Sequence, residues 1–142
     1  MNKSRIIPSL LYNDAEKAIE WLCDAFGFDE SFIYQSEDGK IAHAELTYKG
    51  SMIMLGSAKS VSPFSKLIRQ PQDSDGFETQ SPYVIIDEKD IEGHYNNAKL
   101  HDAKIAIEFK TESYGGKSYS CYDPEGHLWC FGSYDPWEVI SK

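Results

Sequence analysis

A histidine and a glutamate two positions apart are the side chains best suited to chemistry in this sequence. His43 and Glu45 lie in residues 41–48, where polar and apolar side chains alternate as they do along a half-buried strand. Ala44 and Leu46 suit packing against a helix, so we expect the histidine and the glutamate on the opposite face. There the pair can orient a polar ligand, or act as a general base with an adjacent proton carrier. The alternative is that the two side chains only hydrogen-bond each other at a partly solvated surface.

An internal repeat adds further candidates. Residues 50–56 match residues 126–132 at one constant offset, with a glycine at both ends of each copy. Such self-similarity indicates two copies of one supersecondary unit. Strand alternation within the copies selects four side chains, and the same offset applied to His43 and Glu45 selects two more. We therefore expect the following side chains on the face of His43 and Glu45: Met52, Met54, Leu128 and Cys130 from the alternation, and Tyr119 and Cys121 from the offset.

The elements that must position these side chains follow a β-α-β-β-β order in the first half of the chain. Asn13 and Asp14 offer a helix N-cap, and apolar residues at helical spacing predict a helix over 15–26 that ends at Gly27. Strand patterns, one hairpin among them with an Asp-Gly turn, surround this helix. The predicted strands cover residues 5–12, 28–35, 41–48 and 51–55.

The second half repeats this order. Its predicted helix covers residues 90–101, and its predicted strands cover residues 82–86, 105–110, 117–122 and 127–131. The first module thus covers about 4–57 and the second about 81–134, followed by a tail at 135–142. The segment 58–80, rich in serine, glutamine, aspartate and proline, is predicted to be a linker with a short helical turn at 64–68. A lid over a binding site is the alternative for this segment.

Length and composition favour a single globular domain over residues 1–142 and exclude several function classes. There are 23 Asp and Glu against 14 Lys and Arg, a net charge of −9, and no basic run, so we expect no nucleic-acid partner. No apolar run approaches the length of a membrane span, and no secretory signal follows the N-terminus. The cysteines lack CxxC spacing, which favours reduced thiols and a cytoplasmic protein. Phosphate-loop, GxSxG, HExxH and dinucleotide motifs are also missing from the sequence.

The motifs together resemble a known superfamily. The matching segments are residues 12–14, 18–22, 25–28, 43–46 and 123–132, the last opening with Asp123-Pro124-Glu125-Gly126-His127. This pattern is similar to the vicinal oxygen chelate superfamily, which includes glyoxalase I, extradiol dioxygenases, and fosfomycin- and bleomycin-resistance proteins. The resemblance implies an α+β fold in which two βαβββ modules form a half-open, curved, eight-stranded, barrel-like sheet. The helices then lie on its convex side and a ligand cavity lies on its concave side. The resemblance also implies a homodimer.

The resemblance further implies where a metal ion would bind, with ligands on the first and fourth strands of each module. These positions fall on Met54 and Cys130 and near Ile7 and Ser81. None of the four is a carboxylate or an imidazole, the ligands that hold catalytic first-row metals in such sites. We therefore expect no metal and no other cofactor.

The sequence thus favours a metal-free, bleomycin-resistance-like protein that holds an aromatic or cationic small molecule without transforming it. The cavity we expect is lined by the nine candidates His43, Glu45, Met52, Met54, Tyr119, Cys121, Leu128, Cys130 and Trp137. Trp137 joins them because an aromatic side chain after the last strand must pack over the open end of its own barrel or on a partner subunit. One alternative is a divalent-metal lyase or dioxygenase that uses His43 and Glu45 as ligands. A second is a domain that binds another protein.

Overall fold

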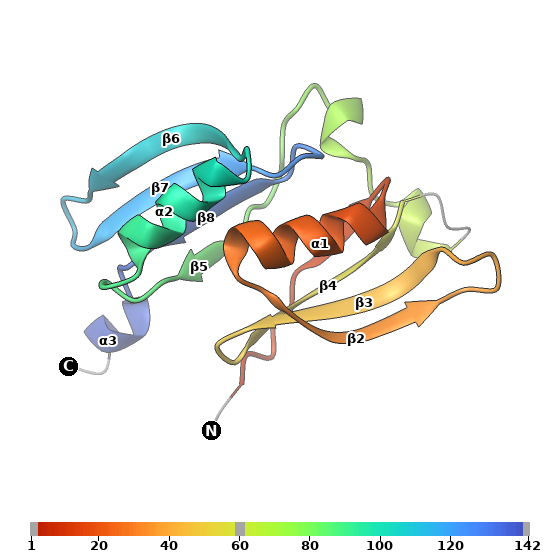
Figure 1. Ribbon diagram of the computed structural model, residues 1–142, viewed down its shortest axis with the longest axis horizontal. Coiled ribbons are helices and arrows are strands. Elements are labelled where there is room, and N and C mark those ends of the chain that lie inside the picture. Colours follow the sequence, from red (N-terminus) through yellow and green to blue (C-terminus); the bar gives the residue numbers. More distant parts are fainter. Residues whose placement is uncertain (1–2, 59–61, 141–142) are drawn as a thin grey trace. The chain divides into compact units, whose positions relative to one another are not determined.

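The computed structural model describes residues 3–58 and 62–140, and the chain divides into two compact units (Figure 1). The first unit is residues 1–77 and the second is residues 78–142. Each unit holds one four-stranded sheet and one long helix. The two modules predicted from the repeat are therefore confirmed, and their strands form two separate hydrogen-bonded sheets of four.

The first unit has the predicted β-α-β-β-β order. Its elements are β1 (Ser9–Tyr12), α1 (Ala15–Phe26), β2 (Asp29–Gln35), β3 (Ile41–Tyr48) and β4 (Ser51–Ser57). The strands lie in the order β1-β4-β3-β2, with β1 parallel to β4 and the other neighbours antiparallel. Strand β2 is consequently an edge strand, and all seven of its residues are exposed.

Local signals in the sequence define helix α1. The side chain of Asp14 accepts a hydrogen bond from the backbone N–H of Lys17, and Gly27 ends the helix in the left-handed conformation at φ 83°. The apolar stripe of the helix packs on one face of the sheet, so its six buried residues recur at helical spacing: Ala15, Ala18, Ile19, Leu22, Ala25 and Phe26. The predicted helix over 15–26 is confirmed.

The second unit repeats this topology. Its elements are β5 (Tyr83–Ile85), α2 (Ile91–Leu100), β6 (Lys104–Thr111), β7 (Lys117–Tyr122), β8 (Leu128–Gly132) and α3 (Pro136–Ile140). The strand order β5-β8-β7-β6, with β5 parallel to β8, matches that of the first unit strand for strand. Helix α3 was not predicted; it lies in the expected tail.

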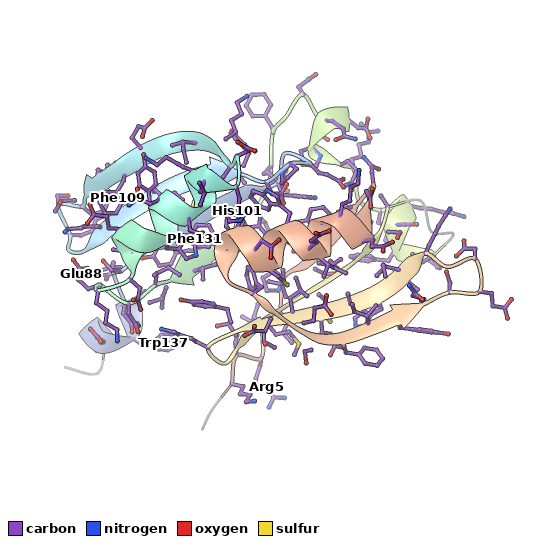
Figure 2. The ribbon with its side chains drawn as sticks, viewed as in Figure 1. Arg5, Glu88, His101, Phe109, Phe131 and Trp137 are labelled. Carbon is purple, nitrogen blue, oxygen red and sulfur yellow. The ribbon has the colours of Figure 1, made fainter. Side chains whose placement is uncertain are left out.

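Aromatic side chains fill the core of the second unit between α2 and its sheet. Phe131 on β8, labelled in Figure 2, stacks on Tyr119 of β7 with ring centroids 5.3 Å apart. Its ring lies 4.4 Å from that of His94 on α2. Trp129 lies on the same face of β8 and is fully buried. This face is therefore closed by α2, which leaves the other face of the sheet for any ligand.

A buried hydrogen bond joins the segment after β4 to strand β1. Gln70 is only 5% exposed, and its Nε2 donates a hydrogen bond of 2.6 Å to the backbone oxygen of Leu11 on β1. The helical turn predicted at 64–68 is present as a 3-10 turn at Phe64–Lys66, and a second one follows at Pro71–Asp73. The hydrogen bond of Gln70 anchors this part of the segment to strand β1.

Within the described residues, no helix is both long enough and apolar enough to cross a membrane.

Gly56 on β4 offers a test of this packing. A Cβ added there would lie 2.8 Å from the backbone oxygen of Ala42, a group that cannot move without disturbing β3. We expect Gly56→Ala to lower the free energy of unfolding by about 1–3 kcal/mol, as measured by urea denaturation. The matched control is Gly93→Ala on α2, where an added Cβ meets nothing within 4 Å. That change should be neutral or stabilise by about 0.5–1 kcal/mol, and an equal loss in both variants would contradict the packing argument.

Candidate functional site

The face of the first sheet turned away from α1 carries the histidine and glutamate pair. His43 Nε2 donates a hydrogen bond of 2.8 Å to Glu45 Oε2, and the two side chains are 40% and 29% exposed. In the sheet Glu45 lies beside Met54, and Met52 lies beside the next outward residue of β3. The structure thus brings these four predicted residues to one face, while their role in binding stays a prediction.

Two aromatic side chains that sequence analysis missed extend this face. Phe32 on edge strand β2 pairs with Glu45, and Tyr34 pairs with His43. Their side chains are 52% and 50% exposed, and the Phe32 ring lies 6.3 Å from the His43 ring. The signal was present in the sequence, because aromatic residues two apart in a strand share a face. We call the face formed by Phe32, Tyr34, His43, Glu45, Met52 and Met54 the open face of the first sheet.

The second sheet presents a different set of groups on the face turned away from α2. Leu128 and Cys130 lie there, as predicted from alternation, and both are partly buried. The hydroxyl of Ser120 donates to Cys130 Sγ at 3.2 Å, and the Ser81 hydroxyl lies 3.8 Å from the same sulfur. The neighbourhood of Ser81 and Cys130, inferred from the resemblance, is therefore present in the structure.

The prediction that Tyr119 and Cys121 share this face is wrong. Both side chains are fully buried on the helix side of the second sheet, where Tyr119 OH lies 2.6 Å from His94 Nδ1 on α2. Glu45 pairs with Met54 in the first sheet, whereas Ser120 pairs with Cys130 in the second. Ser120, and not Cys121, is thus the counterpart of Glu45.

The cause of this shift is the turn between the paired strands. Two residues separate the paired Tyr48 and Ser51, but three residues separate their counterparts Asp123 and His127, which are joined by a backbone hydrogen bond from Asp123 N–H to His127 O. The offset that relates β4 to β8 is therefore one residue too long for β3 and β7. A shift of one residue moves every side chain of a strand to the other face.

Trp137, the last of the nine predicted cavity residues, lies on the short helix α3 (Figure 2). Its side chain is 70% exposed. The backbone N–H of Trp137 donates to Asp135 Oδ1, which fixes the start of this helix. Its expected packing on a partner subunit stays a prediction.

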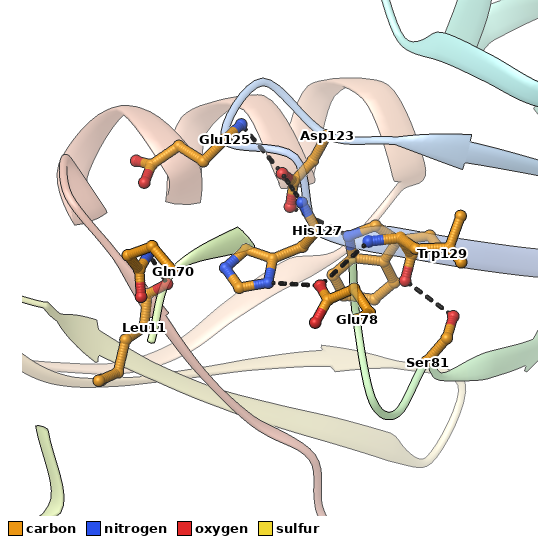
Figure 3. A network of polar contacts seen from close by, with 9 residues as sticks. Leu11, Gln70, Glu78, Ser81, Asp123, Glu125, His127 and Trp129 are labelled. Atoms are coloured by element: carbon orange, nitrogen blue, oxygen red, sulfur yellow. Dashed lines mark hydrogen bonds and ion pairs between the residues drawn. The ribbon is translucent and has the colours of Figure 1, made fainter. Parts of the chain in front are cut away.

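A polar network holds the Asp-Pro-Glu-Gly-His turn in place (Figure 3). Asp123 Oδ1 accepts the backbone N–H groups of Glu125 and His127, each at 3.0 Å, and its Oδ2 accepts Trp129 Nε1 at 3.1 Å. The ring of His127 donates from Nδ1 to Glu78 Oε1 at 2.9 Å, and its side chain is buried. All of these groups are satisfied inside the unit, so the motif has a structural role here.

Burial also determines the ionisation of the groups behind the second sheet. It raises the pKa of Tyr119 well above its ordinary value, with smaller contributions from Cys121 and Tyr95. Burial likewise raises the pKa of the Cys121 thiol to about 12, helped by Asp123 and Cys130. Neither group ionises near neutral pH, so neither can serve as a nucleophile or a general base there.

The family model described as Glyoxalase/Bleomycin resistance protein/Dioxygenase superfamily matches residues 7–131 of the chain. The chain belongs to this superfamily. The resemblance inferred from the motifs is thereby confirmed. A search of curated proteins finds none that matches the chain.

Solved structures of this superfamily share the fold. TioX from Micromonospora sp. ML1 is 26% identical, with a TM-score of 0.69 over 91% of this chain and 94% of TioX. The fosfomycin resistance protein FosX from Listeria monocytogenes, complexed with Mn(II) and sulfate ion, is 14% identical, with a TM-score of 0.67 over 99% and 98% of the two chains. FosX from Mesorhizobium loti is 12% identical, with a TM-score of 0.65 over 99% of each chain.

The metal positions implied by the superfamily do not suit a metal ion in this chain. Met54 and Cys130 occupy the fourth-strand positions, and Cys130 is surrounded by serine hydroxyls. Over residues 3–58 and 62–140, no three His, Cys, Asp or Glu side chains come together as a metal site requires. His43 and Glu45 are two donors on one strand without a third. The donor set therefore does not fit a first-row metal.

The raised pKa values predict an alkaline loss of stability. As pH rises past the ordinary values of 9.0 for cysteine and 10.0 for tyrosine, the unfolded chain loses protons that folded Cys121 and Tyr119 retain. Their contribution is therefore complete below about pH 9 and is lost as pH rises toward their folded pKa values. Urea denaturation at a series of pH values should show a shallower alkaline decline in Tyr119→Phe than in wild type. Identical slopes would contradict this assignment.

Proposed function

We propose that this protein binds a small molecule with an aromatic or cationic group on the open face of the first sheet, without a metal and without transforming it. The observation that carries the proposal is the composition of that face. A hydrogen-bonded His43–Glu45 pair, with its carboxylate 29% exposed, is flanked by the half-exposed rings of Phe32 and Tyr34. Ligand sites combine apolar and aromatic walls with a few polar groups in this way.

Each part of the face favours a flat or positively charged ligand. Aromatic rings attract cations to their faces and stack on planar groups, and thioethers such as Met52 and Met54 adapt to irregular apolar surfaces. Glu45 supplies a carboxylate that can pair with a positive group, while the net charge of −9 attracts cations over a longer range. The His43 ring orients that carboxylate through their hydrogen bond.

Membership of a superfamily that includes bleomycin resistance proteins is consistent with this proposal. The main alternative is an enzyme of the same superfamily, and a single observation favours catalysis. His43 and Glu45 form an oriented imidazole and carboxylate pair of the kind that general acid–base catalysis uses. The FosX structures add only the fold to this alternative because their sequence identities are low.

A charge-removing substitution tests the binding proposal. Glu45→Gln preserves the size of the side chain but removes its charge, so aromatic cations should bind about tenfold more weakly, while neutral analogues of the same shape change little. Calorimetric titration of wild type and variant with paired cationic and neutral ligands, including a bleomycin-type glycopeptide, provides the measurement. Glu37→Gln, an exposed carboxylate in the β2–β3 hairpin, is the matched control for net charge.

Three results would contradict the proposal. The first is that no aromatic cation binds wild type. The second is that Glu45→Gln weakens cationic and neutral ligands equally, because the carboxylate then contributes no charge pairing. The third is that protein purified without chelator carries one equivalent of tightly bound first-row metal, which would favour the enzyme.

We also propose that the protein acts as a homodimer in the cytoplasm. Edge strand β2 is exposed along its whole length and presents Phe32, Ile33 and Tyr34 at 37–52% exposure, a surface that a monomer rarely leaves uncovered. The three cysteines of the protein are free thiols, which fits the reducing environment of the cytoplasm. Sedimentation equilibrium at high micromolar concentration should give twice the mass of the chain. A monomeric mass there would contradict the dimer.

A further inference from the structure

The histidine of the open face already occupies one oxygen of the carboxylate beside it. The His43 ring donates from Nε2 to Glu45 Oε2 at 2.8 Å, and among the described residues this is the only hydrogen bond to that carboxylate. A carboxylate offers two oxygens, and a guanidinium group binds it best by donating one N–H to each. Because the imidazole lies against Oε2, Glu45 presents Oε1 alone to a ligand.

The strand neighbours of Glu45 supply no second charged acceptor. Met54 lies beside it on β4, and Phe32 lies beside it on β2. A thioether is a weak acceptor, and a phenyl ring offers only its face. The carboxylate is 29% exposed, so a ligand reaches it from solvent. A cationic ligand therefore meets one charged oxygen between a thioether and an aromatic ring.

We propose that His43 makes the open face select ammonium over guanidinium groups, and that the ligand is an aromatic amine. Its protonated nitrogen donates one N–H to Glu45 Oε1. An ammonium is a compact charge that one acceptor can serve, whereas a guanidinium loses one of its two parallel hydrogen bonds here. The inference rests on the function proposed above and narrows its ligand class. His43 determines specificity by acting through Glu45.

Strand pairing sets the distance between the charge and the aromatic ring of such a ligand. Neighbouring strands lie about 4.8 Å apart, and Phe32 is the direct partner of Glu45 across β2 and β3. The Phe32 ring is 52% exposed and can stack on the ring of a ligand. A spacer of about two carbons then places the nitrogen of the ligand over Glu45. The preferred ligand is therefore an arylethylamine.

Calorimetric titration with three matched ligands tests the proposal: naphthylethylamine, naphthylethylguanidine and neutral naphthylethanol. In wild type the amine should bind at least about fivefold more tightly than the guanidine. In His43→Leu both oxygens of Glu45 are free, so the guanidine should bind at least as tightly as the amine. His43→Gln, whose amide nitrogen can replace the Nε2–H donor, should restore the preference for the amine.

Thr47→Leu is the matched control for the leucine variant. It places the same apolar side chain two residues from Glu45 on the other side along β3, and it removes no hydrogen bond to that carboxylate. Since Thr47 shares no partner with Glu45, the ratio of the amine and guanidine affinities should change by less than about twofold.

Nitrogen NMR of the imidazole gives a second readout. The His43 signal, assigned by its loss in His43→Gln, should keep its Nε2–H tautomer when the amine binds, because the ligand takes the other oxygen of Glu45.

The possible failures are distinguishable. Equal binding of amine and guanidine to wild type, an unchanged ratio in His43→Leu, or loss of the Nε2–H tautomer on amine binding would overturn this inference and leave the proposed function intact. Equal binding of the amine and the neutral alcohol, or no binding of either cation, would overturn both.

Discussion

A helix closes one face of each sheet, and this constraint decides where chemistry can occur. Helix α1 buries its apolar stripe on the first sheet, and α2 packs over Tyr119 and Phe131 of the second. Burial of these side chains stabilises the fold, so their positions are not available for polar groups. A ligand can therefore bind only on the opposite face of the sheet or at the margin beside the helix. In the first unit these two places are the open face with His43 and Glu45, and a hollow between α1 and β2 that is lined by Ile19, Ile33 and Ile41.

Much of this arrangement could be predicted because local patterns determine it. The N-cap at Asp14, the apolar stripe of α1 and the glycine after it define one helix without reference to the rest of the chain. The repeat of residues 50–56 in 126–132 then carries the topology from one half to the other. Alternation along a strand is also a local pattern, and it placed Met52, Met54, Leu128 and Cys130 correctly on their sheet faces.

The predictions failed where two strands had to be related through a turn. Tyr119 and Cys121 were assigned by an offset measured on β4 and β8, but the longer turn before β8 changes that offset on β7. Alternation along β2 already puts Phe32 and Tyr34 on one face, but only the pairing of β2 with β3 shows that this is the face of His43 and Glu45. The hollow between α1 and β2 likewise takes its lining from one helix and two strands. All of these features depend on contacts between residues that are distant in the sequence, which is why sequence patterns did not predict them.

The unequal turns also have a consequence for how such a protein can change. In most positions a substitution alters one side chain, but a residue added to or removed from the turn at Lys49 and Gly50 would exchange both faces of β3 at once. Ala44 and Leu46 would be presented outward, and His43 and Glu45 would be driven toward the helix. A single inserted residue in such a turn therefore changes which side chains a whole strand presents to solvent, although every side chain of the strand is unchanged.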